Sequence, residues 1–305
     1  MRNLSLLLIA LSIVSCKTIK VNEKVAFQES KYNYEKYSKY VSQTNKSSEE
    51  KNVELSVLDK VINKSENEIS SKSDVKLQRN FLQKEDKKME YFVFTPKTTN
   101  KVSVFFLGNG SSIFNFADNL FELSENTNTK IYVLNYRGYG RSEGTPSFKT
   151  QFDDDNYFYN EILKIEKKID FVIGYSLGSV FATYLAVDNN INELYLLSPV
   201  SDTKDYLSHN KNQGMRGIKV LLKPFIKITA DEDLMKISNV TKIKNYTGKF
   251  VILHGTEDKM LPYSMGKKLF EVSKSTNKKI YTIEGGNHAA AFDNENWLNL
   301  IKEIY

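Results

Sequence analysis

Ser176 lies in a sequence context that favours nucleophilic chemistry. It is the central residue of Gly174-x-Ser176-x-Gly178, which follows an apolar strand predicted over 171–174 and opens an apolar helix predicted over 177–187. A serine on this sharp turn presents its hydroxyl at the sheet edge, and the two glycines lack Cβ atoms that would collide as helix and strand close on the turn. The helix also directs its first N–H groups and the positive end of its dipole at the same place. We therefore interpret Ser176 as a nucleophile.

A serine needs a base to remove its proton and a third group to orient that base. Asp258 follows an apolar strand predicted over 249–254, and His288 follows the next predicted strand, 279–283. Side chains just past the carboxyl ends of strands in an open α/β sheet lie where such proteins place their sites. We expect His288 to be the general base and Asp258 to fix its tautomer.

Neighbouring residues offer alternatives for both roles. Glu257 adjoins Asp258, but its side chain leaves the loop in a different direction. His254 lies inside a strand end, where we expect a structural role, and His209 lies in an inserted region with no fixed geometry.

The strand predicted over 102–107 ends in a glycine-rich loop, Gly108-Asn109-Gly110. Such a loop lets backbone N–H groups approach a substrate oxygen, and each well-aimed donor is worth about 3–4 kcal/mol on a developing oxyanion. We expect the oxyanion hole to consist of the backbone N–H groups of Asn109 and Leu177. The alternative is an ordinary strand-to-helix turn.

The elements that must position these residues alternate between strands and helices. The predicted strands are 91–95, 102–107, 131–135, 171–174, 193–197, 249–254 and 279–283. The predicted helices are 113–125, 150–168, 177–187, 263–274 and 294–304. This alternation predicts an α/β fold with a mostly parallel central sheet flanked by helices.

Four motifs in this order resemble the α/β-hydrolase superfamily over residues 89–305. The segment 135–144, NYRGYGRSEG, is similar to the D-Y-R-G-Y-G-x-S-x-G loop of monoacylglycerol lipases, serine-aminopeptidase-like hydrolases and acyl-protein thioesterases, and 254–258, HGTED, to their acid motif. The resemblance implies the order serine, acid, histidine and assigns the acid to Asp258. Two departures are Leu107, where the group often has histidine, and Asn135, where it has aspartate.

The first sixteen residues predict a bacterial lipoprotein signal over 1–15. Arg2 precedes an apolar stretch, 4–14, that rises only about 16 Å as a helix and is too short to span a membrane. The stretch ends in Ile-Val-Ser-Cys, which resembles a lipobox, so we expect lipidation at Cys16, membrane anchoring and a place in the bacterial cell envelope. The alternative is an ordinary secretory signal.

Residues 16–80 are polar and are predicted to form a tether, or an N-terminal extension whose helix over 53–62 packs on the domain. The hydrolase domain is predicted over 81–305, with a short helical lid at 203–248. Within it, 218–228 reads as a helix that Pro224 is expected to kink or end, and whose apolar side either lines an acyl pocket or packs on the core.

Composition excludes several other classes. The charge of +6 comes from scattered basic residues, 43 against 37 acidic ones, which predicts no nucleic-acid partner. One cysteine and three histidines predict no disulfide and no metal site, and no cofactor is expected. The run 153–155, Asp-Asp-Asp, is expected in a helix's first turn, where carboxylates offset the dipole.

The sequence therefore predicts a serine hydrolase acting on an ester or thioester of small-molecule, lipid or acylated type. An amidase or peptidase of the same fold is the second possibility, and a catalytically inactive surface-binding protein is the third. Substrate identity and oligomeric state are left open.

Overall fold

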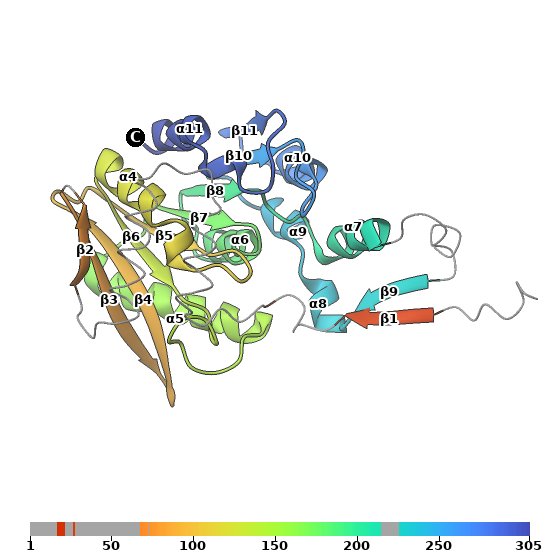
Figure 1. Cartoon of the computed structure of the whole chain (residues 1–305), viewed down its shortest axis with the longest axis horizontal. Coiled ribbons are helices and arrows are strands. Elements are labelled where there is room, and N and C mark those ends of the chain that lie inside the picture. The colour runs from red at the N-terminus through yellow and green to blue at the C-terminus, as the bar shows by residue number, and fades with distance from the viewer. Residues whose placement is uncertain (1–16, 22–26, 28–67, 73, 215–225) are drawn as a thin grey trace, which may run out of the picture.

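The computed structural model describes residues 17–21, 27, 68–72, 74–214 and 226–305 (Figure 1). The predicted signal at 1–15, the lipidation site Cys16 and the helix predicted over 53–62 lie outside these residues. Within the described ranges, no helix is both long enough and apolar enough to cross a bilayer.

One large sheet dominates the described part of the chain and contains nine strands. Six are parallel and run in the spatial order β11 (Lys278–Ile283), β10 (Lys249–Gly255), β8 (Glu193–Leu197), β7 (Phe171–Tyr175), β5 (Lys101–Phe106) and β6 (Thr129–Leu134). Three antiparallel strands extend the sheet beyond β6: β4 (Lys87–Pro96), β3 (Val75–Lys84) and β2 (Glu68–Lys72). The mostly parallel sheet predicted from the sequence is confirmed.

Helices cover both faces of the sheet, which is why the central strands are largely apolar. Every residue of β7 is buried. The helices α4 (Ala117–Thr127) and α11 (Asn294–Ile304) contact each other on one face. The helices of the other face contact one another in the series α5 (Phe148–Glu166), α6 (Gly178–Asp188), α9 (Asn239–Ile243) and α10 (Tyr263–Val272). Two single 3-10 turns complete the domain at Ile113–Asn115 and Ala290–Phe292.

The sheet begins earlier in the chain than the predicted domain boundary at residue 81. Strand β2 and residues 75–80 of β3 lie in the stretch predicted to be tether, so the domain includes residues from Glu68 onward. In β3, Val75, Leu77 and Arg79 alternate into the interior. A buried arginine interrupts the apolar alternation that identifies a strand, and its guanidinium lies 4.0 Å from the buried carboxylate of Glu90.

The segment inserted between β8 and β10 contains α7 (Thr203–Gly214), β9 (Ile226–Ala230), α8 (Glu232–Lys236) and α9. Residues 226–228 are in a strand, so the predicted helix does not continue through them; it was expected to kink or end at Pro224, and residues 218–225 lie outside the described residues. Strand β9 pairs in parallel with β1 (Lys17–Val21), a partner about two hundred positions away in the sequence. Figure 1 shows this two-stranded ribbon beside α8 and below α7.

Candidate active site

Ser176 occupies a strained turn between β7 and α6. Its φ is +53°, a left-handed value that a non-glycine residue adopts only where the surroundings impose it. A Cβ at Gly178 would lie 2.3 Å from the carbonyl oxygen of Phe106 in the neighbouring β5, and one at Gly174 would lie 2.6 Å from the carbonyl oxygen of Gly178. The two glycines therefore permit the close approach that holds the serine in this turn.

His288 lies within hydrogen-bond distance of both expected partners. Its Nε2 is 3.0 Å from Ser176 Oγ, and its Nδ1 is 2.7 Å from Asp258 Oδ2. Two contacts fix the imidazole and its backbone: the ring of Tyr175 packs 5.2 Å from the imidazole, and the Ser198 hydroxyl donates to the His288 carbonyl at 2.8 Å. Neither Tyr175 nor Ser198 was identified from the sequence, since both act through contacts between separate strand ends.

The carboxylate of Asp258 is buried and surrounded by hydrogen-bond donors. Its Oδ1 accepts from the backbone N–H groups of Met260 at 2.8 Å and Leu261 at 2.9 Å, while Oδ2 faces His288 and also His254 Nε2 at 3.3 Å. Burial alone would raise the pKa of this carboxyl, but the hydrogen bonds from His254 and His288 outweigh it and hold the pKa well below its ordinary value. Asp258 is therefore ionised in the folded protein at neutral pH.

The alternatives weighed from the sequence occupy other positions. Glu257 is exposed, and its backbone N–H donates to the Gly286 carbonyl, which joins the acid loop to the histidine loop. His254 is fully buried and lies 2.8 Å from the Leu261 carbonyl oxygen, as expected for a structural histidine, and it also contacts Asp258. His209 is on α7, with its Nε2 2.9 Å from the carbonyl oxygen of Lys259.

The loop expected to carry the oxyanion donors is held by two tyrosines from the segment 135–144. The Tyr136 hydroxyl donates to the Leu107 carbonyl at 2.6 Å. The Tyr139 hydroxyl donates to Asn109 Oδ1 and accepts from the Gly110 N–H, both at 3.1 Å. The loop is therefore fixed from the side by aromatic hydroxyls. Both tyrosines belong to the motif at 135–144 that resembles the related hydrolases, but the sequence did not indicate the contacts that they make.

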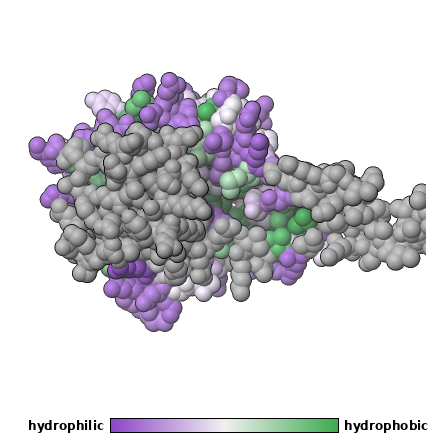
Figure 2. Space-filling view, in the orientation of Figure 1, coloured by the Kyte–Doolittle hydropathy of each residue, from purple (hydrophilic) through white to green (hydrophobic). Residues whose placement is uncertain are grey.

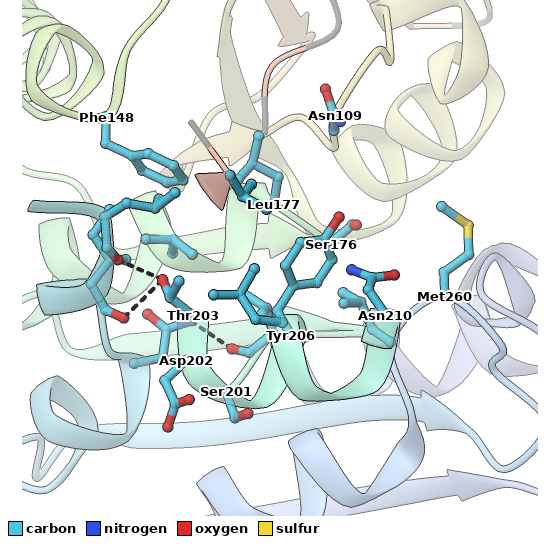
Figure 3. A pocket seen from close by; sticks show the side chains of 18 of the residues that line it. Asn109, Phe148, Ser176, Leu177, Ser201, Asp202, Thr203, Tyr206, Asn210 and Met260 are labelled. Carbon is cyan, nitrogen blue, oxygen red and sulfur yellow. Dashed lines mark hydrogen bonds between the residues drawn. The ribbon is translucent and has the colours of Figure 1, made fainter. Parts of the chain in front are cut away.

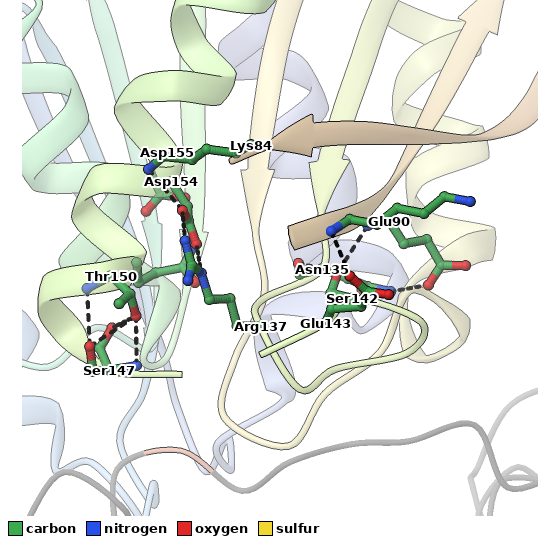
Figure 4. A network of polar contacts seen from close by, with 12 residues as sticks. Lys84, Glu90, Asn135, Arg137, Ser142, Glu143, Ser147, Thr150, Asp154 and Asp155 are labelled. Carbon is green, nitrogen blue, oxygen red and sulfur yellow. Dashed lines mark hydrogen bonds and ion pairs between the residues drawn. The ribbon is translucent and has the colours of Figure 1, made fainter. Parts of the chain in front are cut away.

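Asn135 replaces an aspartate of the related motif, and its surroundings explain why (Figure 4). Its amide Nδ2 donates to Glu90 Oε2 at 2.8 Å, and the Arg141 N–H donates to the same oxygen at 3.0 Å. The Ser142 hydroxyl donates to the Asn135 carbonyl at 2.8 Å. An aspartate at this buried position would place a second carboxylate against Glu90, whereas the amide supplies a donor.

The acidic run at 153–155 does not lie in the first turn of a helix, so the expected dipole role is wrong. A capping box between Ser147 and Thr150 starts α5 at Phe148, which puts the run in the second turn. Asp154 instead accepts two hydrogen bonds from Arg137, at 2.6 and 2.8 Å, and lies 3.0 Å from Lys84 (Figure 4). Among the described residues, no cluster of three or more His, Cys, Asp or Glu side chains is arranged to hold a metal ion.

A cavity of about 270 Å³ adjoins Ser176 and the predicted oxyanion residues Asn109 and Leu177. Much of its apolar lining comes from α6 and the inserted segment, and includes Val180, Val200, Leu207, Leu234 and Ile237. Figure 3 shows Tyr206 and Asn210 of α7 on the same side as Ser176, with Phe148 on another wall. Figure 2 shows hydrophobic residues at the surface where the β1–β9 ribbon meets the domain, beside a hollow.

The sheet order, the serine turn and the triad-like contacts define the α/β-hydrolase fold. A family model described as alpha/beta hydrolase fold matches residues 104–222. The Pyrococcus furiosus esterase Pf2001 superimposes with a TM-score of 0.59 at 16% identity, covering 75% of this chain and 91% of the esterase. At 16% identity, this similarity shows a shared fold only.

Curated relatives point to the same superfamily. Alpha/beta hydrolase domain-containing protein 17B of Xenopus laevis is 28% identical over 191 residues, which are 62% of this chain and 55% of the relative. The lysophosphatidylserine lipase ABHD12 of Danio rerio is 27% identical over 168 residues, covering 52% of this chain and 44% of the relative. The chain thus spans about half the length of these relatives. Together the comparisons support the α/β-hydrolase superfamily and a hydrolase.

Proposed function

We propose that the chain is a serine hydrolase that cleaves an ester or thioester through Ser176, His288 and Asp258. The observation that carries the proposal is the position of one imidazole, with Nε2 3.0 Å from the serine hydroxyl and Nδ1 2.7 Å from the carboxylate. Side chains from the ends of three strands, β7, β10 and β11, are thereby arranged so that His288 can take the serine proton while the ionised Asp258 orients the imidazole and stabilises its charged form.

In the proposed first step, Ser176 Oγ attacks the substrate carbonyl carbon while His288 Nε2 takes the hydroxyl proton. Collapse of the tetrahedral intermediate breaks the bond to the leaving alcohol or thiol, which receives that proton, and leaves an acyl-serine ester. Water then attacks the ester with His288 again acting as base, and releases the acid and the free serine. Asp258 stabilises the imidazolium in both halves and stays ionised.

The cavity supports an acyl group as the part of the substrate that binds. Its lining combines aliphatic side chains with polar ones such as Asp202 and Lys259, and burying methylene groups against the aliphatic part is favourable by about 0.8 kcal/mol each. The name of one relative, lysophosphatidylserine lipase, is consistent with an acyl ester substrate. We propose in addition that the chain is anchored in the bacterial cell envelope by a lipid on Cys16.

Labelling with a fluorophosphonate probe tests the reaction, because the probe phosphonylates an activated serine. We expect the wild type and Ser208→Ala to be labelled equally, since Ser208 is an exposed serine on α7, and Ser176→Ala to remain unlabelled. Hydrolysis of p-nitrophenyl esters should follow the same pattern. An unlabelled and inactive wild type would contradict the proposal and favour the binding protein that the sequence left as a third possibility.

A further inference from the structure

The N-terminal strand β1 lies at the edge of the cavity beside Ser176. Val21, its last residue, is one of the cavity's lining residues and pairs with the buried Ala230 of β9. The ribbon is therefore continuous with the inserted segment that supplies Leu234 and Ile237 to the same lining. A residue far from the domain in sequence thus contributes to the space next to the serine.

Phe27 holds the same part of the chain to the body of the domain. Its side chain is 5% exposed, and its ring packs 5.1 Å from Phe148, 6.2 Å from Phe181 and 6.4 Å from Tyr136. Phe148 itself lines the cavity, and Tyr136 donates to the loop that carries Asn109. Phe27 therefore supports both a cavity wall and the loop predicted to bind the oxyanion.

We propose that β1 and Phe27 form a wall of an acyl-binding pocket and set the longest acyl chain that the enzyme accepts. Val21 is the residue that determines specificity for acyl-chain length, and Phe27 positions the ring of Phe148 in the wall of the same pocket. The inference rests on the proposed function, because it assigns the substrate's acyl group to the cavity beside Ser176. A surface tether would not need a valine in the cavity or a phenylalanine buried among three aromatic rings.

The volume and chemistry of the pocket indicate which chains it fits. A methylene is similar in size to a water molecule, whose share of liquid volume is about 30 Å³. A cavity of about 270 Å³ therefore has room for an acyl chain of several methylene groups. A tryptophan at position 21 would fill several methylene volumes of this space, so the longest chains would no longer fit.

The experiment measures kcat/KM for p-nitrophenyl esters from acetate to dodecanoate with the full chain. Each methylene kept out of an apolar pocket lowers kcat/KM about fourfold. We expect Val21→Trp to lower the ratio of decanoate to acetate kcat/KM by at least tenfold. Phe27→Ala should lower the same ratio, because Phe148 loses its support. Lys227→Ala, on the exposed side of the partner strand, is the matched control and should keep the wild-type ratio.

Two results overturn different parts of the reasoning. A wild type that hydrolyses none of the esters contradicts the proposed function, and this inference with it. A wild type that hydrolyses them while Val21→Trp keeps the wild-type ratio contradicts the pocket wall alone. Thermal unfolding of each variant identifies any loss caused by misfolding, and Val21→Trp remains decisive if Phe27→Ala does not fold.

Discussion

The substitution Asp258→Asn keeps the shape of the side chain and removes its charge. Two backbone N–H groups, from Met260 and Leu261, point at Oδ1, so the asparagine oxygen must take that position. Its NH₂ group then occupies the Oδ2 position, which lies 2.7 Å from His288 Nδ1 and 3.3 Å from His254 Nε2. An NH₂ group cannot accept a hydrogen bond from His288, so the contact survives only if His288 Nδ1 becomes the acceptor.

That requirement places the imidazole proton on Nε2, the atom 3.0 Å from Ser176 Oγ. The histidine then donates to the hydroxyl and cannot take its proton. In serine proteases the wrong tautomer lowers kcat by about 10⁴-fold. We expect a loss of that order here, with KM close to the wild-type value because Asp258 is not part of the cavity lining.

Steady-state hydrolysis of a short p-nitrophenyl ester at neutral pH measures the effect, with circular dichroism to check folding. Glu257→Gln is the matched control: it neutralises the adjacent, exposed carboxylate and should keep wild-type kcat. If Asp258→Asn retains kcat within tenfold of wild type, or if Glu257→Gln shows the larger loss, the assigned role of Asp258 is refuted.

Three further outcomes are expected. Tyr139→Phe removes the hydroxyl that joins Asn109 to the Gly110 N–H, so kcat should fall about tenfold with little change in KM, and an unchanged kcat would show that the loop does not need it. Burial alone would raise the pKa of Glu303, but hydrogen bonds led by that from Lys279 lower it from 4.5 to about 2. This stabilisation is present above pH 4.5 and is lost as the pH falls towards 2. Urea unfolding should therefore show Glu303→Gln less stable than wild type by about 1–2 kcal/mol at pH 6 and equal to it near pH 2, whereas a difference independent of pH would contradict the assignment. Cys16→Ser should move the protein from the membrane to the soluble fraction, and unchanged fractionation would exclude the lipid anchor.

The elements that the sequence predicted correctly are those whose residue patterns lie within a short stretch of the chain. The helix predicted over 294–304 is α11 without a shift at either end, and the strand predicted over 193–197 is β8. Ser176 was identifiable because strand, turn glycines and helix all lie within a few residues of it. Asp258 and His288 were identifiable because each follows a strand end, and parallel strands bring their carboxyl ends to one edge of the sheet.

Contacts between distant segments escaped sequence reasoning. Residues 75–80 of β3 were assigned to the tether because the stretch up to residue 80 is polar and its apolar residues are sparse; one of its polar residues, Arg79, is buried in the interior near Glu90. One local contact was also missed: the capping box between Ser147 and Thr150 starts α5 at Phe148 and so places the acidic run in the second turn of the helix. The partner of β9 is β1, and no periodicity within either strand indicates the other.

The sequence by itself determined the candidate nucleophile, acid and base and the order in which they occur, because residue type, order and turn signals are properties of short stretches of chain. The tertiary structure decided how those groups are held and what surrounds them. The tyrosines that hold the loop predicted to bind the oxyanion and the valine from β1 in the cavity depend on packing between residues far apart in the chain. That packing follows from which surfaces fit together in the folded state, and local residue patterns do not record it.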